Sequence, residues 1–322
     1  MLRATYEVSP PGSSRAFGAL RGRVVGGDGS TVVVEFPDDN WGRDVNLLVA
    51  AIVAGEVMEL GELARCRLID LELPDELLPG PAFGAGAGVT VGVIVKPPLG
   101  LAPAGVAEVA RAAMAGGARF VKDDETLGDP AWCPLAERVR AVARVIGPEV
   151  VYCPNVTGPS LTLLDRARMA VDLGASGLLV DPFAQGLDGL LALRDAGLGV
   201  PLFAHRAGSG PWARNPDFGP TGAVLARLLR LCGADYVVAG GFGGTLFEAD
   251  EEVRANIGAA HGPCGSARPA VAALGGGLGP DDVRAQVDAA GGAGGLLVLL
   301  GSRAHADPAG LEAAVGRAVR SL

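Results

Sequence analysis

Eight short apolar segments, each compatible with a buried β-strand, alternate with helical stretches from Val89 to the end of the chain. Strands that alternate with helices are typical of parallel sheets, and eight such units over about 230 residues are what a closed (β/α)8 barrel requires. A doubly wound open sheet is the alternative, but no GxGxxG motif follows the first strand, so the barrel is favoured. The expected strands are Thr90–Val95, Arg119–Lys122, Val150–Cys153, Gly177–Val180, Leu202–His205, Tyr236–Ala239, Ala270–Leu274 and Leu296–Leu300, with helices such as Pro103–Ala115 and Leu161–Asp172 between them.

The first 80 residues follow a different pattern. Val32–Phe36 is a β-rich run, Asn46–Glu59 has the character of a helix, and Ala64–Leu73 alternates with a period of two. Mixed strands and a helix predict a small α+β domain, of the ferredoxin-like kind, over residues 1–80. Residues 75–88 are rich in proline and glycine and read as a linker, so the barrel domain is expected over residues 89–322.

Composition excludes several classes of function. The net charge of −9 disfavours nucleic acid and anionic membranes as partners, and no apolar segment approaches the length of a membrane span. The N-terminus lacks a signal-peptide core. The 5 cysteines are an odd number without CxxC spacing, which argues against a structural zinc site or a disulfide framework. We therefore expect a cytoplasmic protein.

The four charged residues Lys122-Asp123-Asp124-Glu125 follow directly after the second expected barrel strand. Active sites of β/α barrels are built at this end of the strands. Asp124 and Glu125 offer the hard oxygen ligands that Mg²⁺ takes, and Lys122 either pairs with an acid or becomes a ligand after modification. A solvated loop with an internal ion pair is the alternative for these residues considered alone.

Other expected strands also end in polar or glycine-rich segments. Lys96 ends the first strand, and His205-Arg206 ends the fifth. Glycines follow the last two strands at Gly275–Gly277 and Gly301-Ser302, where exposed backbone N–H groups commonly bind phosphate in such barrels. One mouth would thus collect a divalent metal, cationic side chains and a phosphate site. That combination suits a phosphorylated sugar or sugar acid that loses a proton next to its carbonyl.

Four segments carry a resemblance to a known family. They are VKPPLGL (95–101), GGARFVKDDE (116–125), AHRAG (204–208) and LLRLCGADYVVAGGFGG (228–244). They resemble the large chain of ribulose-bisphosphate carboxylase, and especially the RuBisCO-like proteins called form IV. The resemblance covers nearly the whole chain, with shortened ends.

This resemblance implies a role for most of the polar residues at the mouth. It implies that CO₂ converts Lys122 to a carbamate, which ligates Mg²⁺ together with Asp124 and Glu125. It implies that Lys96 transfers protons at the substrate. It also implies that His205 lies beside Arg206, which binds the distal end of the substrate. The residues implied to hold the phosphate groups or polar ends of the substrate are Arg206, Gly276, Gly277, Gly301 and Ser302.

The departures from the family pattern argue against CO₂ fixation. Pro98 stands where the family has a second lysine, Gly243–Thr245 lacks the lysine of the mobile loop, and a histidine is replaced near Val238. Glu56 aligns with an asparagine that the family places near the metal. We therefore expect Glu56 to transfer a proton, and to act on the barrel of a partner subunit in a homodimer or a larger homo-oligomer.

Retention of the lysine and both acids favours an enzyme. The expected reaction is Mg²⁺-dependent formation of an enolate from a phosphorylated keto-sugar or sugar acid, of the isomerase or tautomerase type. The alternatives are a decarboxylase or transcarboxylase/hydrolase of a 3-oxo sugar-acid phosphate such as 3-oxo-isoapionate 4-phosphate, and a non-catalytic relative that binds sugar phosphates. The sequence does not name the substrate.

Overall fold

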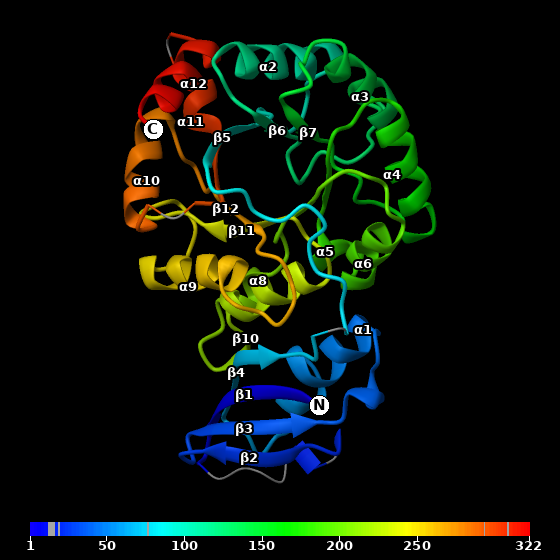
Figure 1. The fold of residues 1–322 in the computed structure, drawn as a ribbon, viewed down its shortest axis with the longest axis vertical. Coiled ribbons are helices and arrows are strands. Elements are labelled where there is room, and N and C mark those ends of the chain that lie inside the picture. Colours follow the sequence, from blue (N-terminus) through cyan, green and yellow to red (C-terminus); the bar gives the residue numbers. More distant parts are fainter. Residues whose placement is uncertain (12–16, 19, 76, 293, 308) are drawn as a thin grey trace.

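The computed structural model describes residues 1–11, 17–18, 20–75, 77–292, 294–307 and 309–322, which form a small sheet at one end and a β/α barrel at the other (Figure 1). The small sheet has the strand order β10-β4-β1-β3-β2. Its first strand buries every second residue, as a sheet with one covered face requires. The strands are β1 (Leu2–Ser9), β2 (Arg23–Gly27), β3 (Thr31–Phe36), β4 (Arg65–Glu72) and β10 (Phe218–Pro220).

Strand β10 joins the small sheet to the barrel. It belongs to the barrel part of the chain but pairs in parallel with β4, and Cys66 N donates to Asp217 O at 2.8 Å. Arg67 on β4 reinforces this junction, because its guanidinium donates to the carbonyls of Trp212 at 3.0 Å and Ala213 at 2.7 Å. The small sheet is therefore fixed to the barrel by backbone pairing as well as by the linker.

The predicted helix over Asn46–Glu59 is wrong as a single element. The segment forms a short α-helix α1 (Val45–Leu48), a π-helical turn η3 (Val49–Val53) and a 3-10 turn η4 (Glu56–Met58). Gly55 marks the break: a Cβ atom there would lie 1.5 Å from the carbonyl oxygen of Ala50. This close approach of two backbone segments is open only to glycine.

The barrel prediction is confirmed. Eight parallel strands follow the order β7-β6-β5-β13-β12-β11-β9-β8, and a bridge between Asn155 and Leu179 links the two ends of the sheet. Side chains from these strands, among them Phe120, Phe203 and Leu297, fill the interior, so the barrel is a packed core with a mouth. The strands are β5 (Val89–Ile94), β6 (Phe120–Lys122), β7 (Val151–Cys153), β8 (Leu178–Val180), β9 (Leu202–Ala204), β11 (Tyr236–Gly240), β12 (Val271–Leu274) and β13 (Leu296–Leu300).

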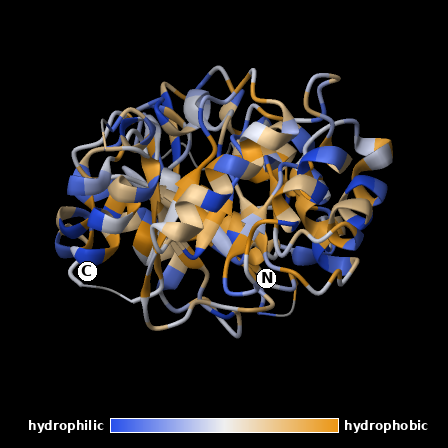
Figure 2. Cartoon of the chain, turned by 90° about the horizontal axis from the view of Figure 1, so that it is seen from above, coloured by the Kyte–Doolittle hydropathy of each residue, from blue (hydrophilic) through white to orange (hydrophobic). Residues whose placement is uncertain are grey.

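Helices surround the strands, and their hydrophilic residues face outward while the strands inside are hydrophobic (Figure 2). The predicted helix Pro103–Ala115 has these bounds in the structure, and the predicted Leu161–Asp172 begins as a 3-10 turn, η5 (Ser160–Thr162). Among the described residues, no helix has the length and apolar character needed to cross a bilayer. The helices are α2 (Pro103–Ala115), α3 (Leu135–Ala143), α4 (Leu163–Asp172), α5 (Pro182–Gln185), α6 (Leu187–Asp195), α7 (Gly210–Ala213), α8 (Gly222–Leu231), α9 (Asp250–His261), α10 (Val283–Ala289), α11 (Ser302–His305) and α12 (Leu311–Arg320).

Candidate active site

A cavity of about 490 Å³ lies at the carboxyl ends of the barrel strands. It collects residues that follow β5, β6, β9, β11, β12 and β13, which is where a parallel barrel brings its strand ends together. Of the residues predicted for the site, the structure places these on its lining: Lys96, Lys122, Glu125, His205, Arg206, Gly276, Gly277, Gly301 and Ser302.

Lys122 reaches the cavity from the end of β6, although its side chain is completely buried. Its ammonium donates to the carbonyl oxygen of Asp123 at 2.8 Å and lies 3.3 Å from Oε2 of Glu125. The same nitrogen is 5.6 Å from the centre of the Phe203 ring. The lysine is thus held between an acid and an apolar wall, with its amine directed to the mouth.

Asp124 lies beside the cavity and is bound by Lys96. The Lys96 ammonium contacts Oδ2 at 2.5 Å, while the hydroxyl and backbone N–H of Thr126 donate to Oδ1. Burial by itself would raise the pKa of Asp124, but the hydrogen bonds from Lys96 and Thr126 outweigh it and hold the pKa below its ordinary value of 3.8. Asp124 therefore remains a carboxylate at neutral pH.

Glu125 has the same balance of effects. Burial favours its neutral form, but the charges of Lys122 and His205 lower its pKa below the ordinary value of 4.5. Both acids are thus in the charged form that binds a divalent cation.

His205 connects Glu125 to Asp181, a residue that the sequence analysis missed. Its Nε2 lies 3.4 Å from Oε2 of Glu125, and its Nδ1 lies 3.3 Å from Oδ1 of Asp181. Ala207 N donates to the same Nδ1 at 3.1 Å, and Asp181 Oδ1 is buried without a hydrogen bond. Because Nδ1 accepts the hydrogen bond from Ala207 N, the ring proton lies on Nε2 and points to Glu125, and Asp181 Oδ1 receives no proton from the ring.

Asp123 was also missed, because it is one of four adjacent charged residues and only its contacts set it apart. It is completely buried and accepts hydrogen bonds from Arg138 Nε at 2.8 Å, the Tyr152 hydroxyl at 2.9 Å and Asn155 N at 3.0 Å. The carboxylate therefore ties β6 to the neighbouring strand and to α3. It fixes the backbone between Lys122 and Asp124 and does not line the cavity.

The glycines after β12 and β13 form one wall of the cavity. Gly276 and Gly277 have φ angles of +113° and +76°, which side chains rarely adopt. A Cβ atom on Gly276 would lie 2.7 Å from Cγ of Leu246, and one on Gly277 would lie 3.0 Å from the Thr245 hydroxyl. Glycine is thus required here, and it leaves backbone N–H groups accessible to an anion.

Arg206 lies at another part of the cavity and is paired with Glu248, which the sequence analysis also missed. Their side chains are 13% and 3% exposed. Phe247, next in the chain to Glu248, packs with its ring centre 6.0 Å from the Arg206 guanidinium.

Glu56 does not belong to this cavity within one chain. It begins η4 in the small sheet domain and is exposed. The expectation that it acts on a partner's barrel stays a prediction.

A metal site depends on Lys122. No group of three or more His, Cys, Asp or Glu side chains is arranged to hold a metal ion within the part of the chain that the structure describes. Asp124 and Glu125 supply two carboxylates, each now bound by a lysine ammonium in the position of a counter-cation. A lysine converted to a carbamate would supply the third oxygen ligand, so the donor set fits Mg²⁺ only with that modification.

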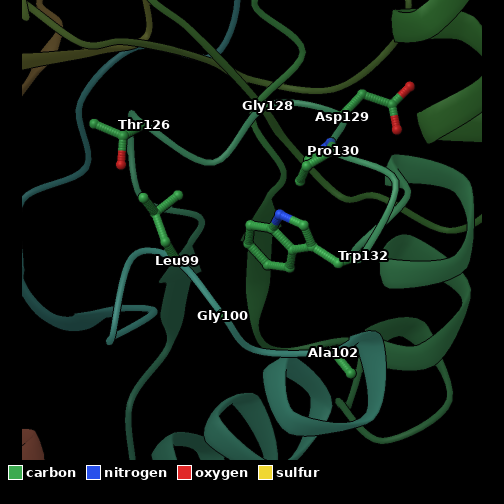
Figure 3. A pocket seen from close by; sticks show the side chains of 8 residues that line it. All are labelled: Leu99, Gly100, Ala102, Thr126, Gly128, Asp129, Pro130 and Trp132. Carbon is green, nitrogen blue, oxygen red and sulfur yellow. The ribbon is translucent and has the colours of Figure 1, made fainter.

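A larger cavity of about 710 Å³ lies beside the mouth, between the loops that follow β5 and β6 (Figure 3). Trp132 and Leu99 extend into it, and Asp129 is the ionisable side chain among its lining residues. Asp129 already accepts a hydrogen bond from Leu135 N at 2.6 Å. This cavity is therefore poor in reactive groups, and the smaller one is the better candidate for the active site.

Known proteins are similar to this chain in both fold and sequence. A RuBisCO-like protein from Burkholderia fungorum has a solved structure with a TM-score of 0.88 and 26% identity, covering 99% of this chain and 93% of that one. A 3-oxo-isoapionate-4-phosphate transcarboxylase/hydrolase from Xanthobacter autotrophicus is 34% identical over 73% of this chain and 61% of its own length. A 2,3-diketo-5-methylthiopentyl-1-phosphate enolase from Geobacillus kaustophilus is 36% identical over 64% of this chain and 54% of its own.

The matched region thus spans little more than half the length of these two curated relatives. Residues 81–260 match the ribulose bisphosphate carboxylase large chain, catalytic domain, which is more than half of the chain and includes Lys122, Asp124 and Glu125. The chain belongs to the family of ribulose bisphosphate carboxylase large chains, whose RuBisCO-like members resemble it throughout the barrel.

Proposed function

We propose that this chain is a Mg²⁺-dependent enzyme that removes a proton next to the carbonyl of a phosphorylated keto-sugar or sugar acid, as an isomerase or tautomerase, without fixing CO₂. The observation that carries the proposal is the convergence of Lys96, Lys122 and Glu125 with a glycine-lined wall in one cavity. Similarity to a named enolase and a named transcarboxylase/hydrolase supports an enzymatic role.

In this proposal, one group of residues binds the phosphate and another holds the metal. The N–H groups of Gly276 and Gly277 bind the phosphate and fix the position of the substrate, while Gly301, whose N–H already donates to Leu278 O at 3.0 Å, lines the cavity beside Gly277. Lys122 as a carbamate, Asp124 and Glu125 would hold Mg²⁺, which when bound lowers the energy of negative charge on the substrate oxygen.

Lys96 and His205 move protons in this proposal. Lys96 is on the lining, with its nitrogen at the Asp124 carboxylate, and transfers a proton at the substrate carbon. His205 holds or returns a proton at a substrate oxygen through Nε2, the ring nitrogen that faces Glu125. The Thr245 position carries no amine that could direct CO₂, which is why carboxylation is not proposed.

A second candidate is cleavage of a carbon–carbon bond in a 3-oxo sugar-acid phosphate. The name of the Xanthobacter relative favours it. Both reactions pass through a carbanion next to a carbonyl, so the same cavity would serve them.

The test is exchange of substrate protons in D₂O, followed by NMR on a panel of keto-sugar and sugar-acid phosphates. We expect exchange with Mg²⁺, loss of exchange with EDTA, and loss in Lys122→Ala. Loss of a carboxyl group from one of the tested sugar-acid phosphates would favour carbon–carbon bond cleavage, the second candidate. Undiminished exchange in Lys122→Ala would refute the metal-dependent mechanism.

A further inference from the structure

The one arginine among the described residues that line the cavity is already paired with an acid of the same chain. Arg206 Nη1 contacts Glu248 Oε1, and Glu248 is the more buried of the two, with 3% of its side chain exposed. Glu248 does not itself line the cavity. A ligand in the cavity therefore meets a guanidinium whose charge is balanced from the side away from the ligand.

Glu248 depends on this pairing. Both of its carboxylate oxygens are buried and neither makes a hydrogen bond of good geometry, so the close ionic contact with Arg206 is what compensates its charge. Gly240 borders the pair: a Cβ atom there would be in ordinary contact, at 3.6 Å, with both Arg206 Nη2 and Glu248 Oε2. Taking Arg206 away from Glu248 would leave a buried carboxylate without a counter-charge, which is strongly unfavourable.

The other cations that line the cavity are matched in the same way. Lys96 is paired with Asp124, and Lys122 with Glu125. One part of the lining can attract an anion without an acid already beside it. This is the wall that contains Gly276 and Gly277, called the glycine wall, where backbone N–H groups attract negative charge. The cavity thus offers one anion site without a matching acid, which suits one phosphoryl group.

The aromatic ring of Phe247 packs against Arg206. Phe247 lines the cavity and is 38% exposed, and its ring centre lies 6.0 Å from the Arg206 guanidinium and 5.4 Å from that of Arg214, which does not line the cavity. A neutral ion pair beside an aromatic ring suits an uncharged group better than a phosphate.

We propose that Glu248 is a specificity-determining residue that restricts the cavity to substrates with a single phosphoryl group and an uncharged opposite end. The inference rests on the proposed function and narrows its substrate class. A second phosphoryl group would have to share Arg206 with Glu248, and the two negative charges would repel each other in surroundings of low dielectric constant. The glycine wall binds the single phosphoryl group, and the end near Phe247 receives an uncharged group.

The test compares a pentitol 5-phosphate with the corresponding pentitol 1,5-bisphosphate by titration calorimetry without metal. The wild type should bind the two ligands within about threefold of each other. Glu248→Gln should bind the bisphosphate about tenfold more tightly than the wild type does, and the monophosphate unchanged within about threefold. Glu251→Gln is the matched control, because it removes the same charge from an exposed position at the start of α9, and it should leave the ratio unchanged.

Two results would overturn the inference. One is a wild-type preference for the bisphosphate of about tenfold or more, which decides the matter even if Glu248→Gln does not fold. The other is a lower bisphosphate affinity in Glu248→Gln, which would mean that Glu248 positions Arg206 for a second phosphate. Failure of both ligands to bind would refute the phosphate site and the proposed function together, whereas loss of metal-dependent proton exchange with the expected binding ratio would refute only the proposed reaction.

Discussion

Lys122 is the residue on which the proposed chemistry depends, because a carbamate on it completes the set of oxygen ligands. We expect activity to rise after preincubation with bicarbonate and Mg²⁺, and ¹³C-labelled bicarbonate to give a carbamate signal by NMR. Lys122→Ala should lose the signal and at least about 10²-fold in kcat. Lys96→Met is the control: it should keep the carbamate and lose turnover. An Lys122→Ala variant with full activity would contradict the metal site.

Sequence reasoning found most of the residues that line the cavity and missed the acids that contact them. Lys96, Lys122 and Arg206 could be placed because each follows an apolar run, and parallel strands bring such positions to one mouth. Asp181 directly follows the expected strand Gly177–Val180, so the same rule could have found it, whereas Glu248 lies in the loop after β11 and matters only because its side chain contacts Arg206. No local pattern encodes such a contact, so it requires the folded chain.

At the scale of elements, the loops after β12 and β13 decide phosphate binding. Gly276→Ala would force an alanine into φ +113° and place its Cβ 2.7 Å from Leu246, which distorts the wall. We expect a loss of about tenfold or more in affinity for the phosphorylated substrate, measured as KM or by calorimetry. Gly275→Ala is the control, since its Cβ meets only Leu299 at 3.7 Å; equal losses in both variants would argue against a special role for the wall.

Two histidines join elements of the barrel and make its stability depend on pH. His305 on α11 contacts Ile94 O at 2.8 Å, and His261 at the end of α9 contacts Gly295 O at 2.9 Å. Burial lowers the pKa of both below the ordinary value of 6.5. Below pH 6.5 the unfolded chain therefore binds protons that the folded chain does not, so stability is lost as pH falls from 6.5 toward the lowered values.

This linkage can be measured by urea unfolding between about pH 5 and pH 8. Each histidine contributes a slope of at most about 1.4 kcal/mol per pH unit. Replacing both with glutamine keeps a donor for the carbonyls and should flatten the slope above about pH 5, where the aspartates and glutamates contribute little. An unchanged slope in the double variant would show that other groups cause it.

The elements themselves were predictable to different degrees. The eight barrel strands were found because each is an apolar run bounded by turns. The helix over 46–59 was wrong because the close contact between Gly55 and the Ala50 carbonyl breaks it; this contact is local in sequence, so Gly55 itself was the signal that the sequence analysis did not use. Strand β10 has three residues and pairs with β4 about 150 residues earlier in the chain, which leaves no local signal.

At the scale of the whole molecule, the prediction that Glu56 acts on a partner's barrel requires an assembly. Within one chain Glu56 is exposed in the small sheet domain, away from the lining of the cavity. The rim of the barrel mouth exposes Leu99 and Trp132, at 56% and 43%. We propose that the small domain of one subunit covers the mouth of its partner, so that Glu56 completes the partner's site. A fully active protein that sediments as a monomer would contradict this assembly.

Complementation between two inactive variants tests whether Glu56 acts on the partner subunit. Glu56→Gln keeps the shape of the side chain and removes its proton transfer, so kcat should fall by roughly 10²-fold with substrate binding largely kept. In a mixed dimer of Glu56→Gln and Lys122→Ala, one of the two sites would combine an intact Lys122 from one subunit with an intact Glu56 from the other. Random mixing after denaturation and refolding should therefore restore about a quarter of the wild-type activity. If Glu56 served its own barrel, or served none, the mixture would be no more active than the average of the two variants.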